Sequence, residues 1–394
     1  MKVITDKNKI KELLERGTED IFIKDNLEKA LYSGKPLRVK FGIDPTGPAI
    51  HLGRAIPLRK LRAFQDLGHR VVLIVGDFTA KIGDPSDKLE KRPMLTDKEI
   101  KSYLKNYLKQ IGKIIDISKA EIHFNSKWLA KMSYIETAKL LDCFTVQQMS
   151  KRRNFKERLD AGQDVFVVEF MYPALQGYDS VMVNADVEIG GFDQLFNLKA
   201  GRTVQKKYGK KEQDIMTLVM LEGTDGRKMS SSWGNIISLL DSSEEMFGKI
   251  MALKDELIIK YFILCTNLSL EDVSIIEKDL KNGKNPKEIK MQLAFEITKI
   301  YHKEKKALLA KRDWVSKFEK KEIPEELTEI KGEGLLIDLL IKNKLVNSKN
   351  QARRLFEEGA VLDLEKKEKI LDFKYISKKG QKFKIGKKLF IKIV

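Results

Sequence analysis

The stretch FGIDPTGPAIHLGR, residues Phe41–Arg54, predicts the end of a strand, a turn broken by proline and glycine, and then a helix. We expect the helix to cover Leu52–Asp66 and to stop at Gly68. Pro57 falls near the helix start, where a missing N–H costs little, so it does not argue against this prediction.

Strands are expected on both sides of this helix, over Leu37–Phe41 and Val71–Val75, which completes a βαβ unit. A helix that starts at the carboxyl end of a parallel strand favours anions, because its free N–H groups and its dipole both attract negative charge. The polar and glycine residues placed at this junction are Asp44, Thr46, His51 and Gly53.

Length and composition limit the possibilities. The 394 residues are enough for two or three domains, and the net charge of +18 favours a polyanionic partner such as a nucleic acid. Cys143 and Cys265 are far apart and match no metal-ligand spacing, as expected in a reducing cytoplasm. We expect no signal peptide after Met1, no membrane span and no bound metal.

Further along the chain, Gly83–Ser86 predicts a turn that places Asp84 near the first site, followed by Lys88 and Arg92. Helices are expected over residues 7–33, 97–116 and 133–160, with a short strand at Glu121–Asn125. The third of these helical regions contains the basic run Lys151, Arg152 and Arg153, which we expect on a solvated face.

Residues Glu169–Asp179 are expected to form a helix with three polar groups on one face, Tyr172, Gln176 and Asp179, at positions i, i+4 and i+7. Burying such groups without a partner is costly, so a ligand with a hydroxyl and an ammonium would explain them. A helix with its polar side in water is the alternative.

Two glycine-rich stretches follow. Val187–Gly191 predicts a strand that runs into Gly191-Phe-Asp-Gln194, where backbone can approach a ribose or phosphate. Gly223–Trp233, GTDGRKMSSSW, is expected to be a mobile loop, after a helical stretch at Lys210–Met220. The sequence contains no P-loop and no dinucleotide fingerprint after a strand, which disfavours P-loop NTPases and Rossmann dehydrogenases.

The C-terminal third is expected to be helical from Asp241 to about Lys321, followed by a linker and a small basic module. Residues 333–394 hold 16 basic and 8 acidic side chains. We expect helices at Leu335–Lys344 and Ser348–Glu358, then strands such as LDFKYI and LFIKIV. With Arg353 and Arg354 on a helix, this module is a candidate nucleic-acid binder.

With these pieces in order, the sequence resembles the class I aminoacyl-tRNA synthetases, specifically the bacterial-type tyrosyl-tRNA synthetases. His51-Leu-Gly-Arg54 is similar to the family's HIGH motif, and Lys228-Met-Ser-Ser-Ser232 is similar to KMSKS. The residues from Tyr172 to Gln194 between them match the family pattern, and the last 62 residues resemble its S4 RNA-binding module.

The resemblance implies an α/β fold with a Rossmann-like parallel-sheet catalytic domain, an α-helical domain and a small α+β S4-like domain. The expected boundaries are residues 1–236, 237–322, a linker at 323–332, and 333–394. The first domain would contain a helical connecting insertion at about 125–180 and the KMSKS-type loop at 224–233.

It also implies the activity. Tyrosine and ATP, used with Mg²⁺, would give tyrosyl-adenylate and pyrophosphate, and the tyrosyl group would pass to the terminal ribose of tRNA(Tyr). No tightly bound cofactor is expected, and the protein would be a cytoplasmic homodimer.

Site residues follow from the matched positions. Catalysis at the phosphates is assigned to Thr46, His51, Arg54, Lys88, Arg92, Lys228 and Ser231. Contacts to ATP or the adenylate are assigned to Asp44, Gly53, Gly191, Asp193, Gln194, Lys228, Met229, Ser230, Ser231 and Ser232. Tyrosine binding is assigned to Thr79, Asp84, Asn125, Tyr172, Gln176 and Asp179. Binding of tRNA is assigned to Lys151, Arg152, Arg153, Arg353 and Arg354.

The sequence departs from the family pattern at four positions. Arg54 replaces the second histidine of HIGH, and Ser231 replaces the second lysine of KMSKS. A lost charge-assisted hydrogen bond at Ser231 costs about 10- to 100-fold in rate if nothing compensates. Phe192 stands where a small hydroxyl residue is usual, and Lys40 where some members place a second phenol-binding tyrosine, so Asp179 bears more of the recognition.

Two other functions stay open on the sequence. One is a synthetase for another aromatic amino acid such as tryptophan, against which Asp179 argues as a partner for a phenol. The other is a non-catalytic, synthetase-derived RNA-binding protein with a splicing or regulatory role, which the altered HIGH and KMSKS residues support.

Overall fold

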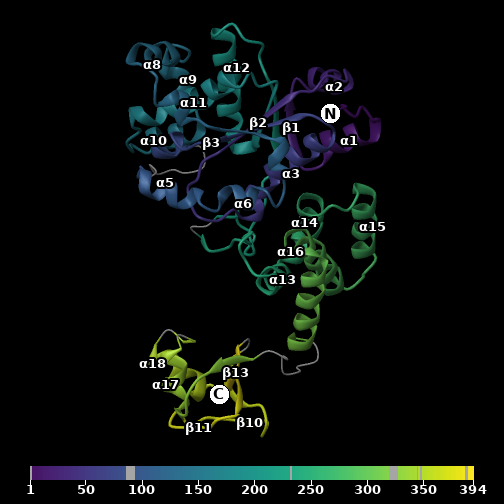
Figure 1. The fold of residues 1–394 in the computed structure, drawn as a ribbon, viewed down its shortest axis with the longest axis vertical. Coiled ribbons are helices and arrows are strands. Elements are labelled where there is room, and N and C mark those ends of the chain that lie inside the picture. Colours follow the sequence, from purple (N-terminus) through teal and green to yellow (C-terminus); the bar gives the residue numbers. More distant parts are fainter. Residues whose placement is uncertain are drawn as a thin grey trace. The chain divides into compact units, whose positions relative to one another are not determined.

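The computed structural model describes residues 2–85, 94–230, 233–318, 327–343, 345–346, 348–386 and 389–394 (Figure 1). The chain divides into two compact units, residues 1–303 and 304–394.

The first unit is built on a six-stranded sheet in the order β1-β6-β5-β2-β3-β4. Its strands are β1 (Thr18–Phe22), β2 (Arg38–Ile43), β3 (Arg70–Val75), β4 (Glu121–Phe124), β5 (Val187–Gly191) and β6 (Asp214–Leu218). All neighbouring strands are parallel except β1 and β6. The order runs outward from β2 through β3 to β4 on one side, and through β5 to β6 on the other. The reversal between β2 and β5 is the position where open α/β sheets bind ligands, at the carboxyl ends of the strands.

Helices cover both faces of this sheet. The helix α3 (Leu52–Asp66) packs against β2, β3 and β5, while α11 (Val167–Met182) and α12 (Leu195–Lys207) lie on the other side (Figure 1). The remaining helices up to β6 are α1 (Lys7–Glu15), α2 (Lys24–Tyr32), α4 (Thr79–Ile82), α5 (Asp97–Leu104), α6 (Tyr107–Ile111), α7 (Ser126–Leu129), α8 (Tyr134–Leu141), α9 (Val146–Ser150) and α10 (Arg153–Asp160).

Between β6 and β7, the elements of the described residues are helices. The helices are α13 (Ser243–Met251), α14 (Ile258–Cys265), α15 (Leu270–Lys281) and α16 (Pro286–Phe318), the last with non-helical dihedrals at Lys303. The helix α14 contacts α3, and Arg59 of α3 donates to the carbonyl of Leu264 at 3.1 Å. The start of this helical region therefore groups with the sheet, and the boundary expected at residues 236 and 237 stays a prediction.

Several expected elements are present. The helix Leu52–Asp66 has the predicted bounds, and its N-cap is His51, whose ring nitrogen accepts from the N–H of Arg54. The strands expected around it, and those at Glu121 and Val187, are β2, β3, β4 and β5.

Two expectations for this unit are wrong. Residues 7–33 form two helices with the strand β1 between them, where only helices were expected. The stretch Lys210–Met220 contains the strand β6 in place of a helix. β6 lies between β1 and β5 in the sheet, and all of its residues are buried. Such a short apolar run cannot be assigned to helix or strand by its periodicity alone.

The second unit has a five-stranded sheet in the order β10-β9-β12-β13-β7 and a two-stranded sheet of β11 and β8. Its elements are β7 (Thr328–Ile330), β8 (Gly334–Leu335), α17 (Leu336–Lys342), α18 (Lys349–Glu357), β9 (Val361–Asp363), β10 (Glu368–Lys369), β11 (Ile376–Ser377), β12 (Lys382–Ile385) and β13 (Leu389–Ile393). Its core includes Ile337, Leu340, Phe356, Phe383 and Ile391, all nearly inaccessible to solvent.

The helices of this unit and β13 agree with the expectations, and Ser348 is the N-cap of α18. Two details differ. The strand expected at LDFKYI is wrong except at Ile376, where β11 starts. Residues Thr328–Ile330, expected in a linker, form β7, which pairs in parallel with β13, so the module begins before residue 333.

Candidate active site

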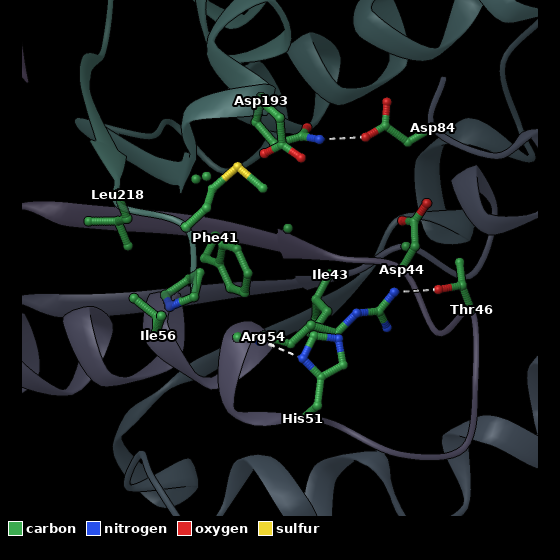
Figure 2. Close-up of a pocket in the computed structure, with 18 of the residues that line it drawn as sticks. Phe41, Ile43, Asp44, Thr46, His51, Arg54, Ile56, Asp84, Asp193 and Leu218 are labelled. Carbon is green, nitrogen blue, oxygen red and sulfur yellow. Dashed lines mark hydrogen bonds between the residues drawn. The ribbon is translucent and has the colours of Figure 1, made fainter. Parts of the chain in front are cut away.

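A cavity of about 920 Å³ opens at the carboxyl ends of the strands, beside the reversal between β2 and β5 (Figure 2). Its lining comes from the ends of β2, β3 and β5, the start of α3, the inner face of α11 and the loop after β6. The predicted site residues in this lining are Asp44, Thr46, His51, Gly53, Arg54, Thr79, Asp84, Asn125, Tyr172, Gln176, Asp179, Gly191, Asp193, Gln194, Lys228, Met229 and Ser230. Residues separated by up to about half of the chain thus surround one space.

Lys88, Arg92, Ser231 and Ser232 fall outside the described residues. Phe192 is 48% exposed and does not belong to the cavity lining. The side chain of Lys40 is fully buried and also outside the lining.

The start of α3 supplies a cation and a neutral imidazole to the cavity. The guanidinium of Arg54 donates to Thr46 Oγ1 at 2.6 Å (Figure 2) and to the hydroxyl of Tyr107 at 3.0 Å. Burial, followed by the charges of Arg54 and Lys228, lowers the pKa of His51 to about 3. His51 is therefore uncharged at neutral pH. Because its Nδ1 accepts from the N–H of Arg54, the ring proton is on Nε2, where it can be donated to a ligand.

A second cation comes from the loop after β6. Lys228 donates to Asp193 at 3.0 Å, and the Sδ of Met229 contacts the N–H of Gly53 at 3.4 Å. Asn235, only 3% exposed, holds this loop: its side chain accepts from the N–H of Ser230 at 2.9 Å and donates to the carbonyl of Lys228 at 3.1 Å. The loop is thereby joined to the start of α3.

Asp44 lies at the carboxyl end of β2 and accepts from Thr79 Oγ1 at 2.8 Å and from the Tyr172 hydroxyl at 2.9 Å. Burial raises its pKa to about 7, against the two hydrogen bonds, which lower it. Gly76, at the end of β3, makes this approach possible, because a Cβ there would lie 1.9 Å from Asp44 Oδ1.

Asp179 of α11 is 3% exposed and bonded by two side chains. Trp128 Nε1 donates to its Oδ1 at 2.7 Å, and Asn125 Nδ2 donates to its Oδ2 at 3.2 Å. Burial raises the pKa of Asp179 to about 6, and the charge of Lys40 opposes that rise. At neutral pH the group is a carboxylate that faces the cavity and accepts hydrogen bonds.

Asp84 meets the start of α12. Gln194 Nε2 donates to its Oδ2 at 2.5 Å (Figure 2), and Asn197 Nδ2 donates to its Oδ1 at 3.3 Å. The amide of Asn197 also donates to Gln194 Oε1 at 3.0 Å. These bonds keep a carboxylate at the opposite wall of the cavity from His51.

Sequence reasoning missed Tyr107, Trp128, Asn197 and Asn235. Each acts on a predicted residue from 5 to 113 positions away, through a contact that no local pattern shows. For Trp128 a signal existed: a tryptophan next to Asn125 can present a buried N–H that needs an acceptor.

The basic residues assigned to tRNA are only partly on the surface. Lys151 and Arg153 are exposed, but Arg152 is 6% exposed and its guanidinium lies over the rings of Phe155 and Phe196. The expectation of a solvated face is wrong for Arg152. In the second unit, Arg353 and Arg354 are exposed; Arg353 stacks on Phe373 and Arg354 pairs with Glu358.

Within the described ranges, no helix is both long and apolar enough to cross a membrane. Those same ranges contain no group of three or more His, Cys, Asp or Glu placed to hold a metal ion.

Comparisons with known proteins agree with this geometry. The family described as tRNA synthetases class I (W and Y) matches residues 32–319. A tyrosine–tRNA ligase from Thermotoga maritima is 44% identical over 389 residues, with 97% of this chain and 96% of the relative covered. One from Carboxydothermus hydrogenoformans is 43% identical over 400 residues, with 97% of each chain covered.

Solved structures show the same fold. A C-terminally truncated mitochondrial tyrosyl-tRNA synthetase from Aspergillus nidulans matches with a TM-score of 0.66 at 21% identity, over 78% of this chain and 93% of that one. A tyrosyl-tRNA synthetase from Archaeoglobus fulgidus, complexed with L-tyrosine, gives a TM-score of 0.61 at 21% identity, over 76% and 99% of the two chains.

Proposed function

The chain belongs to the class I tRNA synthetases (W and Y) and has the activity of a tyrosine–tRNA ligase, and we propose that the cavity at the ends of β2, β3 and β5 carries out both of its steps. In the first step the carboxylate of tyrosine attacks the α-phosphorus of ATP, the bond to the bridging oxygen breaks, and pyrophosphate leaves. In the second step a ribose hydroxyl of tRNA attacks the adenylate carbonyl and releases AMP.

The observation that carries this proposal is the shared lining of one cavity. His51 and Arg54 from the start of α3, Lys228 from the loop after β6, and Asp179 from α11 surround the same space. Cationic and neutral donors therefore lie within one ligand length of a buried carboxylate, which is the arrangement that an aminoacyl-adenylate needs.

No general base is required, because the nucleophile of the first step is already a carboxylate. Rate enhancement then comes from positioning and from stabilising negative charge on the phosphates. We assign the stabilisation of that negative charge to four groups: Thr46, the Nε2–H of His51, Arg54 and Lys228. Because Thr46 accepts from Arg54, its hydroxyl hydrogen can be donated to a phosphate oxygen. Asp44, Gly191, Asp193 and Gln194 are the proposed contacts to the nucleoside and adenylate.

Tyrosine is proposed to lie between α11 and β3, with its phenol at Asp179 and its ammonium near Tyr172, Gln176 and Asp84. A site built to hydrogen-bond the phenol rejects phenylalanine by roughly 10⁴–10⁵, since its buried polar groups would be left unpaired. Asp179 with its two protein donors has room to accept a further hydrogen bond.

The test is tyrosine-dependent ATP–pyrophosphate exchange on the full-length protein, with phenylalanine and tryptophan as controls. Exchange with tyrosine alone is expected. Exchange with none of the three amino acids, while tRNA is still bound, would overturn the proposal in favour of an RNA-binding role.

We also propose the partners and the compartment. ATP would enter as its Mg²⁺ complex, since phosphate oxygens are ligands that Mg²⁺ prefers. The exposed basic residues Lys151, Arg153, Arg353 and Arg354 are proposed to contact tRNA(Tyr). A ligase that uses tRNA works where tRNA is charged, so we place the protein in the cytoplasm.

A homodimer is proposed from the exposed apolar side chains of residues 134–167. Tyr134 is 98% exposed, Val167 80%, Val146 66% and Ile135 65%. Large apolar side chains left in water on neighbouring helices are typical of a surface that is covered in an assembly. Sedimentation equilibrium at micromolar concentration is expected to give twice the chain mass of 45.3 kDa, and a stable monomer would contradict this proposal.

A further inference from the structure

Lys40 of β2 and Glu188 of β5 form a buried ion pair across the two strands at which the sheet order reverses. They are direct partners in the parallel β2–β5 ladder, their side chains are 0% and 1% exposed, and Nζ lies 2.9 Å from Oε1. The same ammonium donates to the carbonyl of Gln176 at 2.8 Å and to Ser180 Oγ at 2.7 Å. The pair therefore ties α11 to the sheet at the level of Gln176.

Both oxygens of Glu188 are occupied by donors. Oε1 accepts from Gln176 Nε2 at 3.0 Å, and Oε2 accepts from Ser180 Oγ at 3.1 Å and from Gln213 Nε2. Gly201 of α12 leaves the space for this cluster, because a Cβ there would lie 3.0 Å from Glu188 Oε2 and closer still to Gln213. A carboxylate can only accept hydrogen bonds, so each of its partners must donate.

This requirement sets the orientation of the Gln176 amide. Its NH₂ group must face Glu188, so its oxygen, Oε1, is the atom left for the cavity that Gln176 lines. Among the described residues, no donor is bonded to that oxygen. An amide oxygen held in this way accepts from an ammonium and offers no donor to a carboxylate or a hydroxyl oxygen.

We infer that the Lys40–Glu188 pair positions Gln176 so that the cavity selects the amino group of the substrate. The inference rests on the proposed function, which places the tyrosine ammonium near Gln176. Lys40 supplies the counter-charge that allows a carboxylate to be buried at this point of the sheet. Without a carboxylate at position 188, no partner would require the NH₂ group of Gln176 as a donor, the amide could reverse, and its NH₂ group would face the ammonium.

Lys40 and Glu188 are thus positioning residues that act on the substrate through Gln176. The charge of Lys40 also acts on Asp179. Burial raises the pKa of Asp179, and the charge of Lys40 is the largest influence that lowers this pKa. The same lysine therefore supports both polar ends of the tyrosine site.

The test compares Glu188→Gln with the double variant Lys40→Met/Glu188→Gln. The double variant leaves no unpaired buried charge, so it can be measured even if the single variant fails to fold. KM for tyrosine in ATP–pyrophosphate exchange is expected to rise about 10-fold or more in a folded variant, with kcat changed much less, because one charge-assisted hydrogen bond is lost. In Glu188→Gln, which keeps the charge of Lys40 near Asp179, the inhibition constant of 3-(4-hydroxyphenyl)propionate, which lacks the amino group, is expected to stay within about twofold, because that hydrogen bond is absent from its complex.

Glu169→Gln is the matched control. Glu169 is on α11, the helix of Gln176, and its ion pair with Arg158 is also buried, at 4% and 3% exposure. The other bonds of that pair go to Asp164 and Phe166, which do not line the cavity, whereas Glu188 bonds the lining residue Gln176. This variant is expected to lower stability without changing the ratio of the two constants.

Two results would overturn the inference: equal weakening of tyrosine and of the analogue in the Glu188 variants, or unchanged constants for both. Failure of the proposed function is distinguishable from these, since the unmodified protein would then show no tyrosine-dependent exchange.

Discussion

Asp179 combines a buried carboxylate with two protein donors, Trp128 and Asn125, which fix its plane beside the cavity. We predict that Asp179→Asn, which keeps the shape and removes the charge, lowers kcat/KM for tyrosine by about 10- to 100-fold. Exchange with phenylalanine should change little, so that the ratio of tyrosine to phenylalanine falls.

The measurement is ATP–pyrophosphate exchange with each amino acid. Asp142→Asn is the control, because Asp142 is an exposed aspartate that pairs with Lys207 outside the cavity. An unchanged ratio in the Asp179 variant would mean that the phenol is recognised elsewhere.

The buried carboxyl group of Asp44 should make the free energy of unfolding depend on pH. Burial raises its folded-state pKa from 3.8 to about 7, so between these values the folded protein holds a proton that the unfolded chain has lost. The free energy of unfolding contributed by Asp44 therefore falls as pH rises from about 4 to about 7. Asp44→Asn removes this dependence. The free energy of unfolding of the variant minus that of the parent should therefore be about 1–3 kcal/mol larger at pH 8 than at pH 5.

Urea unfolding of both proteins at the two pH values gives this difference directly, because the titration of groups that do not interact with Asp44 cancels. Parallel stability profiles would show that Asp44 does not titrate in this range. The gain in stability should accompany a loss of exchange activity, as is common when a buried polar residue of a functional site is replaced.

At the scale of elements, the loop after β6 depends on Asn235. Its amide bonds Ser230, Asp225 and Lys228 at 2.8–3.1 Å, which orders the segment that carries the cavity's second cation. We predict that Asn235→Ala raises KM for ATP and lowers kcat/KM for ATP by about 10- to 100-fold, since Lys228 is no longer held in place.

KM for tyrosine should change little, because the proposed tyrosine contacts are Asp84 and residues of α11, outside this loop. Asn282→Ala is the control, at the exposed C-terminal cap of α15. Equal effects on both substrates would indicate a general loss of structure, which thermal unfolding would reveal independently.

The elements also show which features sequence can predict. The bounds of α3 follow from local signals, His51 as N-cap and Gly68 after the last turn. The helical face of Tyr172, Gln176 and Asp179 follows from spacing alone. The strand β6 does not, because its buried apolar run suits helix or strand equally and is decided by its neighbours β1 and β5.

The site divides in the same way. The site residues in the HIGH-like and KMSKS-like motifs could be predicted, because residue type and local spacing in the sequence are enough to identify them. Lys40–Glu188 and Asn125–Asp179 are contacts between elements 54 or more positions apart, and only the strand order and helix packing bring them together. Arg152 shows the opposite error: a basic run suggests a solvated face, but the rings of Phe155 and Phe196 bury its middle member.

At the scale of the whole molecule, the cavity belongs to one unit, whereas the net positive charge is spread over both and is densest near the C-terminus. The cavity lining lies entirely within residues 1–303, whereas residues 333–394 carry a net charge of +8. We therefore expect adenylate formation to need only the first unit, and binding of a polyanionic tRNA to draw on both.

We therefore predict that a chain ending at Phe318 keeps tyrosine-dependent ATP–pyrophosphate exchange within about threefold of the full-length rate, because each contact to the proposed substrates of that step is retained. Transfer of tyrosine to tRNA should fall by about 100-fold or more at physiological salt, because phosphate contacts in the second unit are lost. The dependence of tRNA binding on salt concentration should also become less steep, since fewer counterions are released. Exchange that falls in parallel with aminoacylation would mean instead that the second unit supports the fold or the cavity of the first.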